Sequence, residues 1–142
     1  MNRRNVLQGI GAAMMLSATS GLAAEAAADD TGVVYELRIY HTFEGKLEAL
    51  LKRFREQETK IFERLGMHGV GYWTPTDEPL KGGTLIYILK HPSREAALAN
   101  WKSFQDDPEW QSVKAKSEAN GKLTEKIDST YLALTDFSPR LR

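Results

Sequence analysis

Alternation of apolar and polar side chains first becomes regular over Val33–Tyr40. One set of alternate positions holds Tyr35, Leu37 and Ile39, and the other holds Glu36, Arg38 and Tyr40. Successive side chains of a strand point to opposite faces of its sheet, so this period of two predicts a β-strand. If the first set packs against helices, the second set points to the opposite face of the sheet.

A helical period follows this strand. After Gly45, apolar side chains recur at helical spacing with Lys, Arg and Glu between them. These positions are Leu47, Leu50, Leu51, Phe54, Ile61, Phe62 and Leu65. They predict one long amphipathic helix that ends at Gly66, where a left-handed cap is expected.

Two further helices have start and stop signals of their own. Ser93 is placed to cap a helix that runs to Phe104. Asp107 precedes Pro108, and proline at the first helical position predicts the start of another short helix. Gly121 predicts where this last helix ends.

Three short apolar segments predict the remaining strands, over Met67–Trp73, Thr84–Leu89 and Ile127–Leu134. The order strand–helix–strand–strand–helix–strand predicts an α+β domain of the ferredoxin-like βαββαβ type. Such a domain has a four-stranded antiparallel sheet with strand order 4-1-3-2 and with helices on one face.

The apolar run Leu85–Leu89 does not alternate, so both faces of this strand need cover. Two helices cover one face only, and exposed apolar surface costs about 25 cal/mol per Å². The simplest cover is a second copy of the sheet, which predicts a homodimer that forms a dimeric α/β barrel. The alternative is that the C-terminal segment 135–142 folds back over the face.

Residues 1–28 have a composition unlike the rest of the chain. Two arginines, Arg3 and Arg4, precede an apolar stretch over Val6–Ala24, and triplets of the small-x-small type follow it. This pattern predicts an export signal of the twin-arginine type, and a periplasmic or secreted domain over residues 29–142. An uncleaved anchor is the alternative, but the interrupted run barely reaches the roughly 20 residues that span a bilayer. No stable membrane insertion is expected after cleavage.

The composition and the motifs of the chain exclude several classes of function. The chain has 142 residues, and its 19 Lys+Arg side chains balance 19 Asp+Glu side chains. It has no basic stripe that would point to nucleic acid as a partner. It has no cysteine, which excludes disulfides, thiolate metal sites and a cysteine nucleophile. No phosphate-binding glycine loop and no nucleophile elbow is present.

Five segments, in this order along the chain, resemble the NIPSNAP family: Val34–Tyr40, Gly71–Trp73, Pro92–Ala96, Trp101–Trp110 and Thr135–Pro139. The Trp-x-x-Phe-x-x-Asp-Pro-Glu-Trp run is the most specific of them, and the resemblance covers residues 33–139. It implies a dimeric α/β barrel of ferredoxin-like topology. Animal members act in mitochondria, in mitophagy and vesicle traffic. The export signal departs from that setting, so those roles are not carried over.

The interpretation is therefore an exported, dimeric domain that binds a small molecule or another protein, with no assigned reaction and no cofactor. A cofactor-independent monooxygenase or isomerase that acts on a small substrate in the barrel is the enzymatic alternative. A purely structural dimer is the third possibility. Relatives of the same fold include cofactor-free monooxygenases and haem-binding proteins, but this is an analogy of fold alone.

The candidate ligand-binding residues are Glu36, Arg38, Tyr40, His68, Trp73 and Tyr87. If Glu36, Arg38 and Tyr40 point into the dimer interior, the charge pair would orient a polar ligand and the phenol would donate a hydrogen bond. The alternative is a satisfied salt bridge within the sheet or across the dimer. Trp73 and Tyr87 would form aromatic walls, or would simply be core residues.

Two further features are open to a functional and an ordinary interpretation. With strand one taken as parallel to strand three, His41, His68 and His91 would lie near one edge of the sheet, as a possible divalent-metal site. Solvated histidines are the ordinary interpretation, and no metal is assigned. Glu58 interrupts the apolar stripe between Phe54 and Ile61. It either reaches solvent at the margin of the stripe, which is the favoured interpretation, or faces a pocket.

Overall fold

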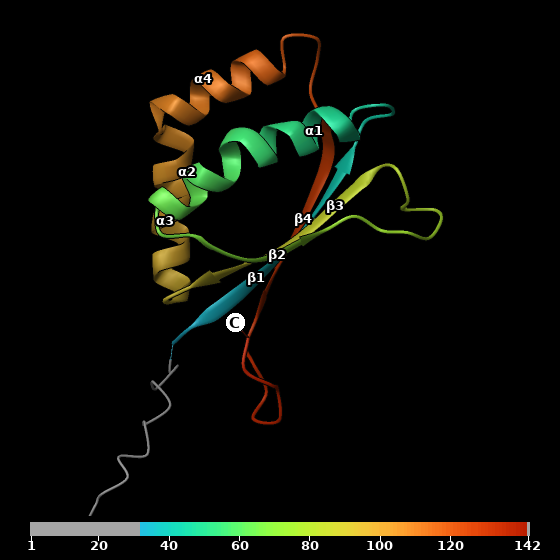
Figure 1. Ribbon diagram of the computed structural model, residues 1–142. Helices are drawn as coiled ribbons and strands as arrows, with labels where there is room; N and C mark the ends of the chain where they lie inside the picture. Colours follow the sequence, from blue (N-terminus) through green and yellow to red (C-terminus); the bar gives the residue numbers. More distant parts are fainter. Residues whose placement is uncertain (1–31, 142) are drawn as a thin grey trace, which may run out of the picture.

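The computed structural model describes residues 32–141, so the predicted export signal lies outside the described residues. The elements are β1 Val34–Thr42, α1 Leu47–Arg53, η1 Phe54–Glu58, α2 Thr59–Arg64, β2 His68–Trp73, β3 Thr84–His91, α3 Arg94–Asp106, α4 Pro108–Ser117 and β4 Thr124–Leu132. The strands form one antiparallel sheet in the order β2-β3-β1-β4, and the helices lie on one face of it (Figure 1). The predicted ferredoxin-like fold is confirmed.

Local signals placed the starts of α3 and α4 and the end of α2 correctly, whereas α3 runs to Asp106 rather than Phe104 and α4 ends at Ser117, before Gly121. Ser93 Oγ accepts a hydrogen bond from the Ala96 amide, and Asp107 accepts one from the Trp110 amide. Each bond satisfies one of the amide groups that a helix start leaves unpaired. Gly66 has a φ of 81°, the left-handed conformation that ends the first helical segment. No helix within residues 32–141 is long and apolar enough to cross a bilayer.

The long helix predicted after Gly45 contains a π-helical turn, η1, between α1 and α2. Thr59 Oγ1 donates a hydrogen bond to the Phe54 carbonyl across this turn, at 2.9 Å. Glu58 lies four residues after Phe54 and three before Ile61, and it is buried like both of them. Single π turns are frequent at functional sites, because they displace side chains from a regular helical face.

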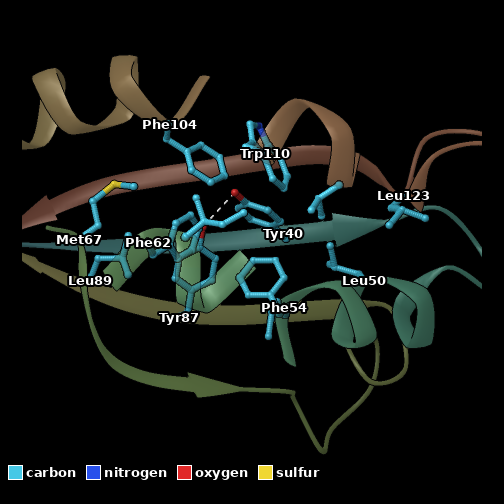
Figure 2. Packing of buried hydrophobic residues seen from close by; sticks show 13 residues of the cluster. Tyr40, Leu50, Phe54, Phe62, Met67, Tyr87, Leu89, Phe104, Trp110 and Leu123 are labelled. Carbon is cyan, nitrogen blue, oxygen red and sulfur yellow. Dashed lines mark hydrogen bonds between the residues drawn. The ribbon is translucent and has the colours of Figure 1, made fainter. Parts of the chain in front are cut away.

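The core lies between the helices and the sheet, and much of it is aromatic (Figure 2). Its buried members are Tyr40, Leu50, Phe54, Ile61, Phe62, Met67, Leu85, Tyr87, Leu89, Phe104, Trp110, Val113 and Leu123. The Tyr87 ring stacks on Phe62, with centroids 6.0 Å apart, and meets Phe54 edge-on at 5.3 Å. The face of the sheet that carries Tyr40 and Tyr87 is therefore the one that the helices cover, and we call it the inner face.

Strand register then decides which side chains lie on that inner face. Arg38 of β1 pairs with Tyr87 of β3, and directly opposed residues share a face. Because Tyr87 and Tyr40 are core residues, Glu36, Arg38 and Tyr40 all face the helices. The condition for placing these three on the opposite face, that Tyr35, Leu37 and Ile39 meet the helices, is therefore not met. Alternation separates two sets of side chains but does not say which set is covered.

The opposite face of the sheet is apolar at its centre, and we call it the open face. It carries Leu37, Ile39, Ile86, Ile88 and Trp73. The first four are partly exposed, and Trp73 is 51% exposed. An added Cβ at Gly71 would lie 2.4 Å from the Trp73 ring, so the indole lies directly over that glycine.

The C-terminal tail reaches one end of the open face only. Leu134 and Leu141 of the tail line a shared hollow with Tyr35 and Ile88. Tyr35 is consequently buried, while Trp73 at the other end stays exposed. In Figure 1 the tail hangs on the side of the sheet away from the helices. The tail therefore covers part of this face and leaves the rest uncovered.

Candidate functional site

A hollow of about 230 Å³ lies on the helix side of the sheet, and we call it the inner pocket. β1 contributes Arg38 and Tyr40 to its wall, the first helical segment contributes Arg53 and Glu58, and α3 and α4 contribute Trp101 and Trp110. A larger hollow of about 650 Å³ lies beside the C-terminal tail, but none of the buried charged residues lines it. The inner pocket is therefore the stronger candidate site.

Glu36 does not line the inner pocket itself, but it accepts hydrogen bonds from Arg38 and Trp101, which do. Its Oε1 accepts hydrogen bonds from Arg38 Nη1 at 2.7 Å and Ser129 Oγ at 2.8 Å. Its Oε2 accepts from Trp101 Nε1 at 2.6 Å, and lies 2.9 Å from His91 Nε2. Burial alone would raise the pKa of Glu36, but these hydrogen bonds, from His91 above all, lower it to about 2. The carboxylate is therefore charged at neutral pH although it is only 1% exposed.

Arg38 brings a fixed positive charge to the pocket wall. Its guanidinium lies over the Trp101 ring, 4.1 Å from the centroid, and Nη2 contacts the Tyr40 hydroxyl at 3.5 Å. Burial alone would lower the pKa of Arg38, but Tyr40, Tyr87 and Glu36 more than offset this and raise it. Nε is buried and has no hydrogen-bond partner within the described residues.

Tyr40 and Tyr87 form a buried phenol pair. The Tyr87 hydroxyl donates to the Tyr40 oxygen at 2.9 Å (Figure 2). Burial raises the pKa of Tyr40, and that of Tyr87 well above its ordinary value. Both phenols are consequently neutral near pH 7. The Tyr40 oxygen already accepts from Tyr87 and Arg38, so its own hydrogen remains available to a ligand in the pocket.

Arg53 and Glu58 form a buried ion pair on the facing wall. Arg53 Nε donates to Glu58 Oε2 at 2.8 Å, and Arg53 Nη1 lies 3.5 Å from Glu118 Oε1. The Arg53 guanidinium also lies over the Trp110 ring, 4.9 Å from its centroid. Burial raises the pKa of Glu58 to about 7, against the opposing effects of Arg53 and Arg38.

The favoured interpretation, that Glu58 reaches solvent, is therefore wrong: its side chain is 1% exposed and lines the inner pocket. The signal was present in the sequence, because Glu58 occupies a core-facing position of the helix relative to Phe54 and Ile61. Arg53, five residues earlier, supplies the partner that makes burial of the carboxylate tolerable. Arg53 itself was not singled out from the sequence.

Charge is unevenly distributed around the inner pocket. Four cationic side chains line it, namely Arg38, Arg53, Lys114 and Lys122, against two carboxylates, Glu58 and Glu118. The two lysines are exposed and the two arginines lie deeper. Such an arrangement attracts an anion to the mouth and offers it guanidinium groups inside.

The other predicted site residues lie elsewhere. Four of the six candidate residues, Glu36, Arg38, Tyr40 and Tyr87, do come together on the helix side. Trp73 lies on the open face, and His68 is exposed at the start of β2, where Nδ1 lies 2.7 Å from Glu63 Oε2. The six candidate residues therefore do not form one site, because four of them lie under the helices and Trp73 and His68 lie apart from those four.

The predicted histidine cluster does not form, because strand one is antiparallel to strand three and not parallel to it. His91 pairs with Val34 at one end of β1, and His41 pairs with Thr84 at the other end. His41 instead lies 3.0 Å from Asp128, and His91 is buried against Glu36. No group of three metal-ligating side chains occurs within residues 32–141.

The architecture defines a ferredoxin-like α+β domain with a charged pocket under its helices. The chain belongs to the NIPSNAP family, whose model matches residues 35–139. The family resemblance found in the sequence motifs is confirmed. No curated protein matches the chain.

Several solved structures share the fold. A NIPSNAP-like domain protein from Burkholderia xenovorans has a TM-score of 0.67 at 20% identity, covering 78% of this chain and 91% of that one. A NIPSNAP family protein from Agrobacterium tumefaciens has a TM-score of 0.66 at 25% identity, covering 75% and 90%. A second protein from that bacterium, described as of unknown function, has a TM-score of 0.66 at 22% identity, covering 78% and 95%.

Proposed function

We propose that this NIPSNAP domain is a binding module for a small organic anion, held in the inner pocket. The observation that carries the proposal is the meeting of two guanidinium groups, the partly buried Arg38 and the buried Arg53, at one hollow of about 230 Å³. They come from different elements, β1 and α1, and each is fixed by its own carboxylate. A carboxylate ligand would accept charge-assisted hydrogen bonds from these groups.

The size and the walls of the pocket favour a small, flat ligand. Its volume is below the roughly 300–1,000 Å³ of pockets that hold drug-sized molecules. The Trp101 and Trp110 rings lie against the guanidinium groups, and together with Phe104 they give the pocket an aromatic part beside its charged groups. A carboxylate attached to a planar or unsaturated body matches both the charge and the shape of this site.

A comparison of benzoate with benzamide tests the proposal, because the two probes differ in charge but scarcely in shape. We expect titration calorimetry on residues 29–142, the chain without its predicted export signal, to show that benzoate binds at least about tenfold more tightly than benzamide. The affinity for benzoate should fall as salt is added. Lys114→Gln and Lys122→Gln at the mouth should each weaken benzoate binding by about two- to fivefold. Lys81→Gln, in the β2–β3 loop, is the matched control. Equal binding of the two probes, or no binding of benzoate, would refute the proposal.

We also propose that the open face is covered by the same face of a second copy. The support is the partly exposed apolar centre formed by Leu37, Ile39, Ile86 and Ile88, which the tail leaves without cover on the Trp73 side. Apolar surface of this kind is normally buried in an interface. Light scattering coupled to size exclusion should give a dimer at micromolar concentration.

Two matched variants locate that interface. Ile86→Lys places a charge on the open face and should give a monomer, because a lysine there would be buried without a partner. Leu98→Lys changes an α3 side chain that is 61% exposed on the helix layer, and it should leave the dimer intact. A monomeric wild-type protein, or dimers unaffected by Ile86→Lys, would contradict this arrangement.

A further inference from the structure

We propose that the inner pocket is also a proton-transfer site, in which Glu58 takes a proton from the carbon beside a carbonyl group of the bound anion and returns it to a carbon further along the conjugated system. The substrate class is a small unsaturated oxo acid, and the reaction is an isomerisation that moves its C=C bond. This inference rests on the proposed binding function, since it uses the same pocket and the same class of ligand.

Glu58 has the geometry of a positioned base. Its Oε2 is fixed by Arg53 Nε at 2.8 Å, whereas no hydrogen bond engages Oε1 among the described residues. The side chain is 1% exposed and lines the pocket, so its free oxygen meets a bound ligand rather than bulk solvent. A carboxylate held by one oxygen and free at the other is suited to abstracting a proton.

Arg38 and Tyr40 supply the positive charge and the hydrogen-bond donor that would stabilise the negative oxygen of the reacting ligand. Both line the same pocket from β1, and each interacts electrostatically with Glu58. Tyr40 accepts from Tyr87 and Arg38, which leaves its hydrogen to donate to an oxygen that becomes negative. Arg38 is rigid, because Glu36 and the Trp101 ring fix it before any ligand binds. Donors fixed in advance around a developing oxyanion are the largest single source of catalysis in many enzymes.

The reaction balances without a further reagent. The electron pair of the broken C–H bond becomes a C=C bond, and the carbonyl oxygen takes the negative charge beside Tyr40 and Arg38. Glu58 carries the proton in this state. When the proton returns to a carbon further along the conjugated system, the carbonyl re-forms, the double bond has moved, and no electron has been gained or lost.

Burial gives Glu58 a suitable strength as a base, because it raises the pKa of the carboxyl group, and the charged groups that face Glu58 modify this effect. Arg53 from α1 and Arg38 from β1 favour its charged form. Glu118, which follows α4, opposes it, as does the burial of the site. The phenols Tyr40 and Tyr87 are neutral and add no charge. The resulting pKa of Glu58, about 7, lies near the working range of a general base at neutral pH.

Deuterium exchange tests the inference directly, with phenylpyruvate and pyruvate as probes. The leaderless protein is incubated with each probe in D₂O, and proton NMR follows the loss of the signal from the carbon beside the carbonyl. We expect wild-type protein to exchange these protons faster than buffer, at a rate that rises with pH through about 7. Glu58→Gln should lower the exchange rate at least about 100-fold while the Kd for phenylpyruvate, from calorimetry, changes less than about threefold.

Two further variants make the outcome decisive. Tyr40→Phe keeps the core ring, should fold if Glu58→Gln does not, and should slow exchange by about 100-fold. Glu56→Gln, an exposed change on the same π turn, should exchange like wild type. Wild-type protein that binds phenylpyruvate but exchanges no faster than buffer would overturn the inference and leave the binding function standing. Exchange unaffected by Glu58→Gln or by Tyr40→Phe would also overturn it, whereas failure to bind any small carboxylate would remove both proposals.

Discussion

Replacement of Glu36 by glutamine isolates the energetic role of the carboxylate behind the pocket. The change keeps the shape but removes the charge and leaves one acceptor oxygen where the carboxylate had two. Arg38 and Ser129 share one oxygen, while Trp101 and His91 share the other. At least two of these groups would therefore face an amide NH₂, and the Arg38 charge would lose its partner.

The pKa of Glu36 sets the size of the effect. The folded value of about 2 lies some 2.5 units below the ordinary 4.5, which corresponds to about 3 kcal/mol of stability from the charged form. Because the folded pKa is lowered, this contribution is present above pH 4.5 and is lost as the pH falls toward 2. Loss of one member of a buried pair costs about 3–5 kcal/mol in general, so we expect Glu36→Gln to cost about 3–4 kcal/mol at pH 7.

Urea unfolding followed by circular dichroism measures this loss. Unfolding is carried out at pH 7 and at steps down to pH 3 for wild type, Glu36→Gln and the exposed control Glu125→Gln on β4. The difference between wild type and Glu36→Gln should shrink as the pH falls, whereas Glu125→Gln should follow wild type throughout. A Glu36→Gln protein within 1 kcal/mol of wild type at pH 7 would refute the view that this carboxylate organises the pocket wall.

Three other outcomes follow from the structure. Burial raises the folded pKa of Glu58 to about 7, so its neutral form is favoured on folding. Its contribution is complete below pH 4.5 and is lost, by about 3 kcal/mol, as the pH rises through 7. Glu58→Gln should abolish that part of the pH dependence in urea unfolding. Ser93→Ala removes the α3 cap and should cost about 1 kcal/mol, against almost nothing for the exposed Ser103→Ala. We propose that the protein is exported by the twin-arginine route, and replacement of Arg3 and Arg4 by lysine should then keep it in the cytoplasm in cell fractionation.

Element boundaries were predictable because their causes are local. The serine cap of α3, the Asp-Pro start of α4 and the glycine after α2 act within one helical turn, and each was found from the residues alone. β1, β2, β3 and β4 differ from the predicted strands by two or three residues at most. Strand ends depend on pairing with a neighbour, which makes them less local than helix caps.

The candidate site was predictable only in part. Glu36, Arg38 and Tyr40 were correctly grouped, because alternate residues of a strand share a face. Arg53 and Glu58 were not connected to them, since they lie on another element and meet Arg38 only through packing of that helix on the sheet. A charged residue within an apolar stripe was the available signal, but its meaning depended on a partner that spacing alone does not identify.

The amino-acid order determined the sequence of helices and strands, their caps and the fold class, because periodicity and capping are properties of neighbouring residues. Tertiary structure decided which face of β1 the helices cover, and it separated the histidines by pairing β1 and β3 in antiparallel fashion. It also decided that Glu58 is buried beside Arg53 rather than solvated. Those outcomes depend on the balance between desolvation and hydrogen bonding among residues from several elements, and that balance exists only once the elements are packed together.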